Sequence, residues 1–137
     1  MTTTAQQPTE EQIKQVEDAK KAVKSMGGEI FPAFRLTTAA GEVVSSENTK
    51  GKIILFNFWF TRCGPCIKEI PELNELVEEF QSEDILFIAP TFDDNIQVEK
   101  FLTRFDFDYS IVSDVKDFCL ELNIRSYPTH FIINREG

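Results

Sequence analysis

Cysteine is scarce in this chain, with 3 residues among 137, and histidine occurs once. Small secreted domains held together by a disulfide framework carry larger, even sets of cysteines, so such a framework is not expected here. Basic residues are also few, since 14 Lys and Arg stand against 23 Asp and Glu, for a net charge of −9. Nucleic acids and anionic membrane surfaces bind basic patches, so this composition argues against both partners.

Long hydrophobic runs are missing as well, because no stretch approaches the roughly 20 residues of a transmembrane helix. Residues 1–7 are rich in Thr and Gln and have neither the basic start nor the apolar stretch of a signal peptide. Either the protein is cytosolic or an export segment lies outside this chain. The composition that is present, 42% apolar and 27% charged residues, is typical of one globular domain with a real core.

The most informative motif is the sequence Cys63-Gly64-Pro65-Cys66. It directly follows an apolar run and directly precedes a helical pattern, which places two thiols at the start of a helix. Free backbone N–H groups and the helix dipole favour a thiolate there. The three-residue spacing brings the two Cβ atoms within about 5–6 Å, close enough for a disulfide, while Pro65 stiffens the turn without losing a hydrogen bond. The motif therefore predicts a dithiol/disulfide redox centre.

Around this motif, strand patterns alternate with helical patterns. Strands are predicted at residues 53–60, 85–90, 109–112 and 129–133, after a hairpin formed by residues 34–36 and 42–44. Such alternation predicts an α/β fold with a mostly parallel sheet covered by helices.

Four helices are predicted from apolar spacing and capping residues. The first begins at a capping box, Thr9 to Gln12, and ends at Gly27-Gly28; the second, after the cysteines, should be kinked by Pro71. The apolar positions of the second helix are Ile67, Ile70, Leu73, Leu76, Val77 and Phe80. The third helix is expected to be capped by Asp94 and to carry Ile96, Phe101, Leu102 and Phe105. The fourth helix carries Val115, Phe118, Cys119 and Leu122.

The segment 134–137 is a turn signal with nothing after it. This leads us to expect a further strand and a covering helix that are missing from the sequence, leaving an unpaired sheet edge. Poor solubility or an oligomer that fills the gap is then expected.

Several of these residues together resemble the thioredoxin superfamily: Phe56-Asn57-Phe58-Trp59, the two cysteines with Gly64 and Pro65, Pro71, and Tyr127-Pro128-Thr129. Further residues resemble its TlpA/ResA-like branch of thiol–disulfide oxidoreductases, which is related to the AhpC/TSA and Redoxin proteins: residues 32–36, Gly41, Gly51-Lys52, Asn57 and Glu69. The resemblance implies a thioredoxin-like fold with a mixed central sheet flanked by helices and an added N-terminal hairpin and helix. We expect a polar tail and amphipathic helix at 1–28 and the thioredoxin-like domain, incomplete at its C-terminus, at 29–137.

The same resemblance implies roles for individual residues. Cys63 would be the exposed nucleophile, Cys66 would resolve the mixed disulfide, and Glu69 would accept the proton of Cys66. Pro128 would be a cis proline that exposes the backbone of Tyr127 to an extended client peptide. Gly64, Pro65 and Trp59 would complete the client-binding site, although Trp59 is expected to pack beneath it rather than touch the client.

Other interpretations of these residues remain open. Arg62 either favours the Cys63 thiolate or is a solvated charge on the rim. Cys119 is expected to be a small buried hydrophobe, and His130 to have a surface or packing role. Cys63, Cys66, Cys119 and His130 offer four possible zinc ligands, but redox use fits the motif better, and no metal or cofactor is expected.

Three functions are weighed. The leading one is a thiol–disulfide oxidoreductase that reduces protein disulfides, because Gly-Pro between the cysteines resembles thioredoxin. A peroxiredoxin-type peroxidase would need Pro and Thr ahead of a single cysteine, and only Thr61 is present. The third is a non-enzymatic binding module that uses the cysteines for stability or metal.

Partners implied by the resemblance are disulfide-containing clients, including apocytochrome c, and a thiol donor, either a membrane carrier or thioredoxin reductase. The branch is typically exported, so a periplasmic or other extracytoplasmic location is expected, with a cytoplasmic alternative.

Overall fold

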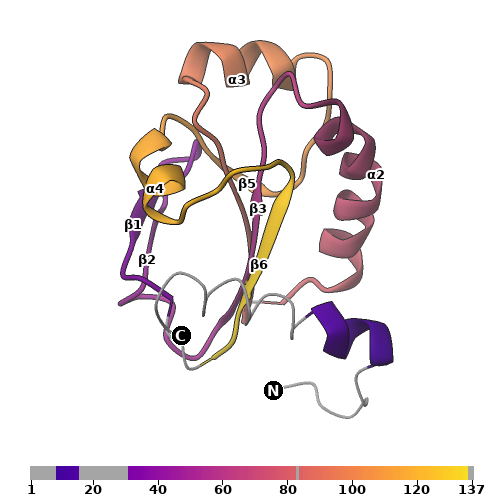
Figure 1. Cartoon of the computed structure of the whole chain (residues 1–137), viewed down its shortest axis with the longest axis vertical. Coiled ribbons are helices and arrows are strands. Elements are labelled where there is room, and N and C mark those ends of the chain that lie inside the picture. The colour runs from indigo at the N-terminus through magenta and orange to yellow at the C-terminus, as the bar shows by residue number, and fades with distance from the viewer. Residues whose placement is uncertain (1–8, 16–30, 83, 136–137) are drawn as a thin grey trace.

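The computed structural model describes residues 9–15, 31–82 and 84–135 (Figure 1). Residues 10–15 are helical. The capping box is confirmed, since Thr9 N–H donates to Gln12 Oε1 at 2.9 Å and Gln12 N–H donates to Thr9 Oγ1 at 3.1 Å. The remainder of the predicted first helix and its glycine stop lie outside the described residues. The boundary between 1–28 and 29–137 therefore stays a prediction.

The central sheet has four strands, β3 (Ile53–Phe58), β4 (Ile85–Pro90), β5 (Ser110–Val112) and β6 (Thr129–Ile133). Their order across the sheet is β5-β4-β3-β6, with β3 parallel to β4, β4 parallel to β5, and β6 antiparallel to β3. The four predicted strands are confirmed, and the sheet is mixed because of β6. Strand β3 ends at Phe58, two residues before the predicted end, where the chain turns toward the cysteines.

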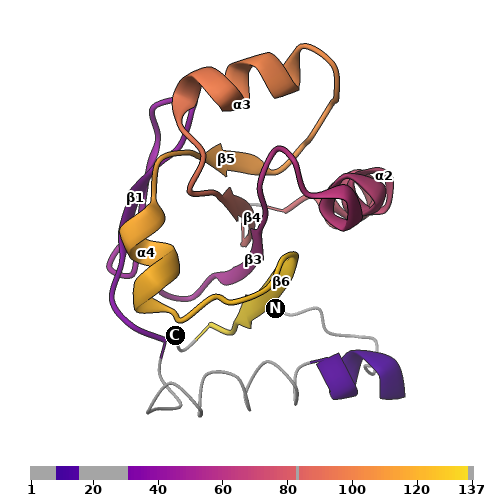
Figure 2. The same ribbon diagram turned by 45° about the horizontal axis from the view of Figure 1, so that its top comes forward.

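Two layers cover this sheet (Figures 1 and 2). Helices α2 (Gly64–Glu79) and α3 (Asn95–Leu102) contribute to one core. The other core lies beneath α4 (Lys116–Glu121) and the predicted hairpin, which is observed as β1 (Arg35–Thr37) and β2 (Val43–Ser45). In the part of the chain that is described, no helix combines the length and apolar character needed to cross a membrane.

The helix boundaries follow from local chemistry. Asp94 caps α3 as predicted, in a capping box in which its Oδ1 accepts the Gln97 N–H at 2.8 Å. Helix α2 starts at Gly64 and runs on through Pro71, which has no N–H to donate to the preceding turn. The kink predicted at Pro71 stays a prediction.

Two apolar positions of the predicted helices are exposed, and a third lies beyond the end of its helix. Phe80 is the C-cap of α2 and is 41% exposed, because the helix ends one residue before it. Ile96 in the first turn of α3 is 64% exposed, and Val98 takes the buried position instead. Phe105 lies beyond the end of α3, where its ring stacks on Phe101 at 4.7 Å.

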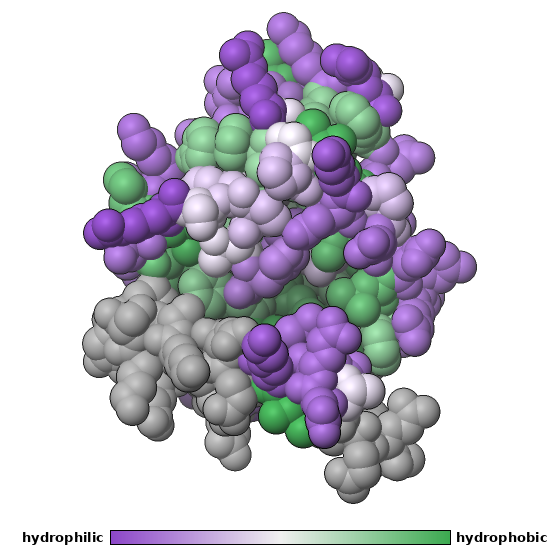
Figure 3. Space-filling model, turned by 45° about the vertical axis from the view of Figure 1, so that its right-hand side comes forward, coloured by the Kyte–Doolittle hydropathy of each residue, from purple (hydrophilic) through white to green (hydrophobic). Residues whose placement is uncertain are grey.

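The outer side of α2 is acidic. Four glutamates lie exposed there: Glu72, Glu75, Glu78 and Glu79. Figure 3, in which the α2 side comes forward, shows hydrophilic side chains around the margin and hydrophobic atoms between them. The four exposed glutamates contribute to the net charge of −9.

Candidate active site

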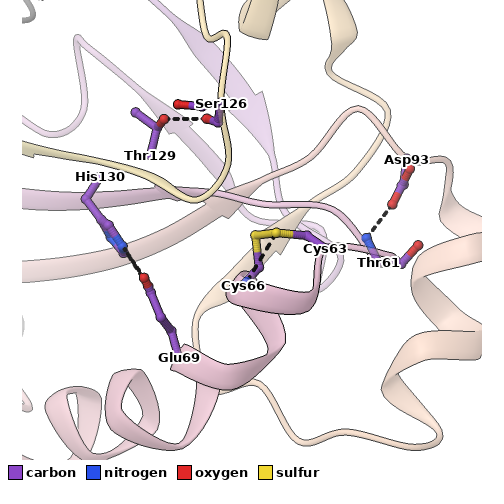
Figure 4. Close-up of a disulfide and its surroundings, with 8 residues drawn as sticks. All are labelled: Thr61, Cys63, Cys66, Glu69, Asp93, Ser126, Thr129 and His130. Carbon is purple, nitrogen blue, oxygen red and sulfur yellow. Dashed lines mark hydrogen bonds and ion pairs between the residues drawn. A yellow bond between two sulfur atoms is a disulfide. The ribbon is translucent and has the colours of Figure 1, made fainter.

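The two cysteines lie where the central strand passes into α2 (Figure 4). They form a disulfide with a Cα–Cα distance of 5.2 Å. Cys63 is the N-cap of α2, with extended backbone angles, and its Sγ accepts the N–H of Cys66 at 3.2 Å. A sulfur therefore takes the capping position that an oxygen usually takes, at the positive end of the helix dipole. The predicted redox pair at a helix start is confirmed.

The expected exposure of Cys63 is wrong for this disulfide form. Cys63 is only 3% exposed and Cys66 2%. The physical reason is that the Cys63 sulfur turns back over the first helical turn, where it is bonded to the buried Cys66 and accepts its N–H. Gly64 and Pro65, between the cysteines, are exposed and form the outer surface of this turn.

The loop that leads to Cys63 is held by a carboxylate that sequence reasoning missed. Asp93 is 7% exposed, and its Oδ2 accepts the backbone N–H of Thr61 at 2.7 Å (Figure 4). Its own N–H donates to Thr91 Oγ1 at 3.2 Å. Asp93 follows the end of β4, and the ends of β3 and β4 meet at the same edge of the sheet. The position of Asp93 shortly after an apolar strand was the sequence signal that could have placed it near the cysteines.

Tyr127–Pro128 is a cis peptide bond, as predicted. Because β6 runs antiparallel to β3, the loop before β6 lies at the end of the sheet where β3 gives way to the cysteines. The loop is closed by Thr129 Oγ1, which donates to the Ser126 carbonyl at 2.6 Å (Figure 4).

The ring of Tyr127 packs against the cluster that contains the disulfide. It also lies 5.4 Å from the ring of Phe60 and 5.6 Å from that of Phe92. Burial raises the pKa of Tyr127, and the charge of Cys119 and a hydrogen bond to it act in the same direction. The Tyr127 hydroxyl therefore stays protonated and tied to Cys119.

Glu69 and His130 form a pair that was not foreseen. His130 Nε2 lies 2.8 Å from Glu69 Oε2 and 3.2 Å from Oε1. The His130 side chain is 42% exposed, which confirms its surface position, and that of Glu69 is 32% exposed. Figure 4 shows the two side chains meeting between α2 and β6, beside the disulfide. The signal was strand alternation, which turns His130 to the face that α2 covers.

Trp59 lies in the core beneath the site rather than on its surface. It is fully buried, and its Nε1–H donates to the Ala89 carbonyl at 3.1 Å. Its ring packs on Phe101 and Phe107 at 5.0 and 5.3 Å. The expectation that it packs beneath the site is confirmed, and its place among the client-binding residues is corrected.

The four candidate zinc ligands are not brought together. Cys63 and Cys66 are joined to each other, Cys119 lies in the opposite core, and His130 is paired with Glu69. Within the described ranges, no group of three or more His, Cys, Asp or Glu residues could hold a metal ion. Cys119 is buried as expected, and burial raises the pKa of its thiol. Arg62 is exposed on the rim of the site.

Comparison with known proteins gives consistent matches. A model described as the AhpC/TSA family matches residues 27–137. The chain is 34% identical over 123 residues to the thioredoxin-like protein YneN of Bacillus subtilis, covering 87% of this chain and 72% of that protein. It is 34% identical over 112 residues to the thiol-disulfide oxidoreductase ResA of Geobacillus kaustophilus, covering 80% of this chain and 64% of that protein.

The crystal structure of StoA from Bacillus subtilis superposes with a TM-score of 0.66 at 29% identity, covering 79% of this chain and 84% of that one. Fold, disulfide position and these matches define a thioredoxin-like thiol–disulfide oxidoreductase. The chain belongs to the AhpC/TSA family, within its TlpA/ResA-like branch. It spans slightly less than two thirds of the ResA protein.

Proposed function

We propose that this chain reduces the disulfides of client proteins through Cys63 and Cys66. The observation that carries the proposal is the capping geometry of Cys63, whose sulfur accepts the Cys66 N–H at the start of α2. The same N–H and the helix dipole favour an anionic sulfur once the disulfide is reduced. The reduced enzyme then offers a thiolate that attacks one sulfur of a client disulfide. A Cys63–client bond forms, the client disulfide breaks, and the departing client sulfur takes up a proton.

Cys66 completes the reaction. Its thiol loses a proton to Glu69, one turn further along α2, and its sulfur attacks Cys63. The Cys63–Cys66 bond forms, the Cys63–client bond breaks, and the second client sulfur leaves as a thiolate that is protonated from water. Two electrons pass from the enzyme dithiol to the client disulfide. Glu69 suits the role of acceptor because its partial exposure lets it exchange the proton with water.

The client binds beside the cis proline. The exposed Gly64 and Pro65 form one side of the site, and the backbone of Tyr127 forms the other by pairing with an extended client segment. Main-chain pairing of this kind accepts many sequences and binds each of them weakly. A weak, general site suits an enzyme whose substrates share a disulfide rather than a sequence.

The class implies disulfide-containing clients and a thiol donor. The resemblance to this branch supports a finer proposal, in which the donor is a membrane thiol carrier, apocytochrome c is one client, and the enzyme works outside the cytoplasm. The observed Cys63–Cys66 disulfide makes a peroxidase with a single reacting cysteine the weaker candidate. A binding module without redox activity is weaker because the relatives that the chain matches include proteins named thiol-disulfide oxidoreductases.

Trapping tests this function. In Cys66→Ser the resolving sulfur is gone, so mixed disulfides between Cys63 and clients should accumulate and be visible on non-reducing gels. Cys63→Ser/Cys66→Ser, which keeps Cys119, is the matched control and should trap nothing. Wild-type protein should reduce insulin, followed as turbidity with dithiothreitol as donor. Wild-type protein with no insulin activity, together with Cys66→Ser that traps no client, would refute the proposal.

A further inference from the structure

The pair formed by Glu69 and His130 joins the two parts of the active site that are far apart in the chain. Glu69 lies on α2, three residues after Cys66, and His130 lies on β6, two residues after Pro128. One imidazole nitrogen approaches both carboxylate oxygens, at 2.8 and 3.2 Å. The described residues place no Lys or Arg side chain within ion-pair distance of Glu69.

We propose that His130 is the positioning residue for Glu69, holding the carboxylate toward β6 so that it can take the proton of Cys66. This inference rests on the proposed role of Glu69 and deepens it. A half-exposed glutamate has three side-chain torsions and samples several rotamers when nothing holds it. The imidazole removes that freedom, because its own position is fixed by the strand.

The position of His130 is set by the sheet. His130 lies directly opposite Asn57 in the antiparallel pairing of β6 with β3. Neighbouring residues of β6, Phe131 and Ile133, are buried in the opposite core and anchor the strand. The His130 ring is therefore presented to α2 from a rigid element, which is the arrangement that keeps a proton acceptor in place.

Two other polar groups on this face, Tyr109 and Asn57, are not charged near pH 7. The negative charge of Glu69, after burial, raises the pKa of Tyr109 to about 12, so that phenol stays neutral near pH 7. Asn57 carries no charge and so cannot form an ion pair with Glu69. Within the described part of the chain, His130 is thus the side chain that orients Glu69.

The test separates the two chemical steps with the small disulfide 5,5′-dithiobis(2-nitrobenzoate) as probe. Reduced enzyme releases one coloured thiolate when Cys63 attacks and a second when Cys66 resolves the mixed disulfide, so stopped-flow absorbance resolves both steps. His130→Leu should slow the second release about tenfold while leaving the first nearly unchanged. His130→Gln, whose amide can still donate to Glu69, should restore most of the lost rate.

A double-mutant cycle completes the test. Because His130 acts through Glu69, His130→Leu combined with Glu69→Gln should be no slower than Glu69→Gln alone. Glu72→Gln, an equal charge change on the same helix, is the control and should leave both steps unchanged. The inference is overturned if His130→Leu and His130→Gln slow both releases equally. It is also overturned if the effects of His130→Leu and Glu69→Gln on the rate of the second release are additive.

The same data distinguish failure at other levels. If Glu69→Gln leaves the second release unchanged, Glu69 is not the proton acceptor, and the positioning role of His130 falls with it while the oxidoreductase function stands. If Cys63→Ser still gives the first release at the wild-type rate, the proposed function itself fails.

Discussion

The two faces of the central sheet are both well packed, but they are built from different side chains. Beneath the hairpin and α4, six phenylalanine rings pack with centroid distances of 5.4–6.4 Å: Phe31, Phe34, Phe56, Phe58, Phe118 and Phe131. Beneath α2 and α3, the core contains the disulfide and Trp59. The buried side chain with an unpartnered oxygen, Asn57, lies on this second face, opposite His130.

Strand β3 serves both faces, because its side chains alternate between them. Phe56 enters the phenylalanine core, and Asn57 enters the side that carries the chemistry. One face therefore packs mainly apolar side chains, while the other also holds the disulfide and the buried amide of Asn57. Substitutions on the two faces should therefore differ in their effects on activity and stability.

The sharpest comparison is between two buried cysteines. Cys63→Ser removes the nucleophile, so insulin reduction should fall to the uncatalysed rate. Cys119→Ala, in the phenylalanine core, should leave the rate unchanged and lower the free energy of unfolding by about 1 kcal/mol, because it removes one small group and a partner of Tyr127. Activity would be measured by turbidity and stability by urea denaturation. Loss of activity in Cys119→Ala would break the division between the faces.

The phenylalanine core should carry more of the stability. Phe56→Ala leaves a cavity at a residue that is 1% exposed, and should lower the free energy of unfolding by about 3–5 kcal/mol. Phe92→Ala is the matched control at a ring that is 37% exposed, and should cost less than about 1 kcal/mol. Urea denaturation at pH 7 gives both values, and equal losses would contradict the prediction.

Alkaline pH should lower the free energy of unfolding, because Tyr109 on the face beneath α2 and α3 ionises. The folded-state pKa of Tyr109 is about 12, mainly because of burial, against 10.0 for an exposed tyrosine. Between these values the folded state holds more protons than the unfolded state, so stability falls as pH rises. The full loss is roughly 2–3 kcal/mol above pH 12, and none is expected below pH 10. Urea denaturation from pH 9 to 12 measures the slope, which should be shallower in Tyr109→Phe. The same slope in the variant would remove Tyr109 as the cause.

The smallest effect concerns Asn57. Its Oδ1 is buried without a partner, which costs free energy. Asn57→Leu replaces the amide by an apolar group of similar size and should raise the free energy of unfolding by about 1 kcal/mol. Urea denaturation measures this change. A loss of stability would show that the amide makes a net favourable contribution on this face.

Much of this arrangement could be predicted from the chain. Apolar runs located all four sheet strands, and the motif between residues 63 and 66 located the disulfide. The cis bond before Pro128 was predicted from the resemblance. These features depend on local sequence or on a motif whose geometry is restricted.

The missed features depend on contacts across long stretches of chain. Asp93 binds Thr61 and Glu69 pairs with His130 only because distant strands and a helix meet. The burial of Cys63 depends on the direction in which its sulfur turns, which spacing does not determine. Likewise, Ile96 fits a helical pattern and yet lies in a first turn that faces water.

The reversed direction of β6 has a consequence for biosynthesis. The cysteines are made early, but the proline loop that faces them is supplied by the last strand of the described sheet. Such pairing between distant segments forms late, since it must first overcome the entropy of closing a long loop. A nascent chain that stops short of Tyr127 would hold two thiols but not the proposed client-binding loop. If this loop binds clients as proposed, selective disulfide exchange requires that β6 has paired with β3.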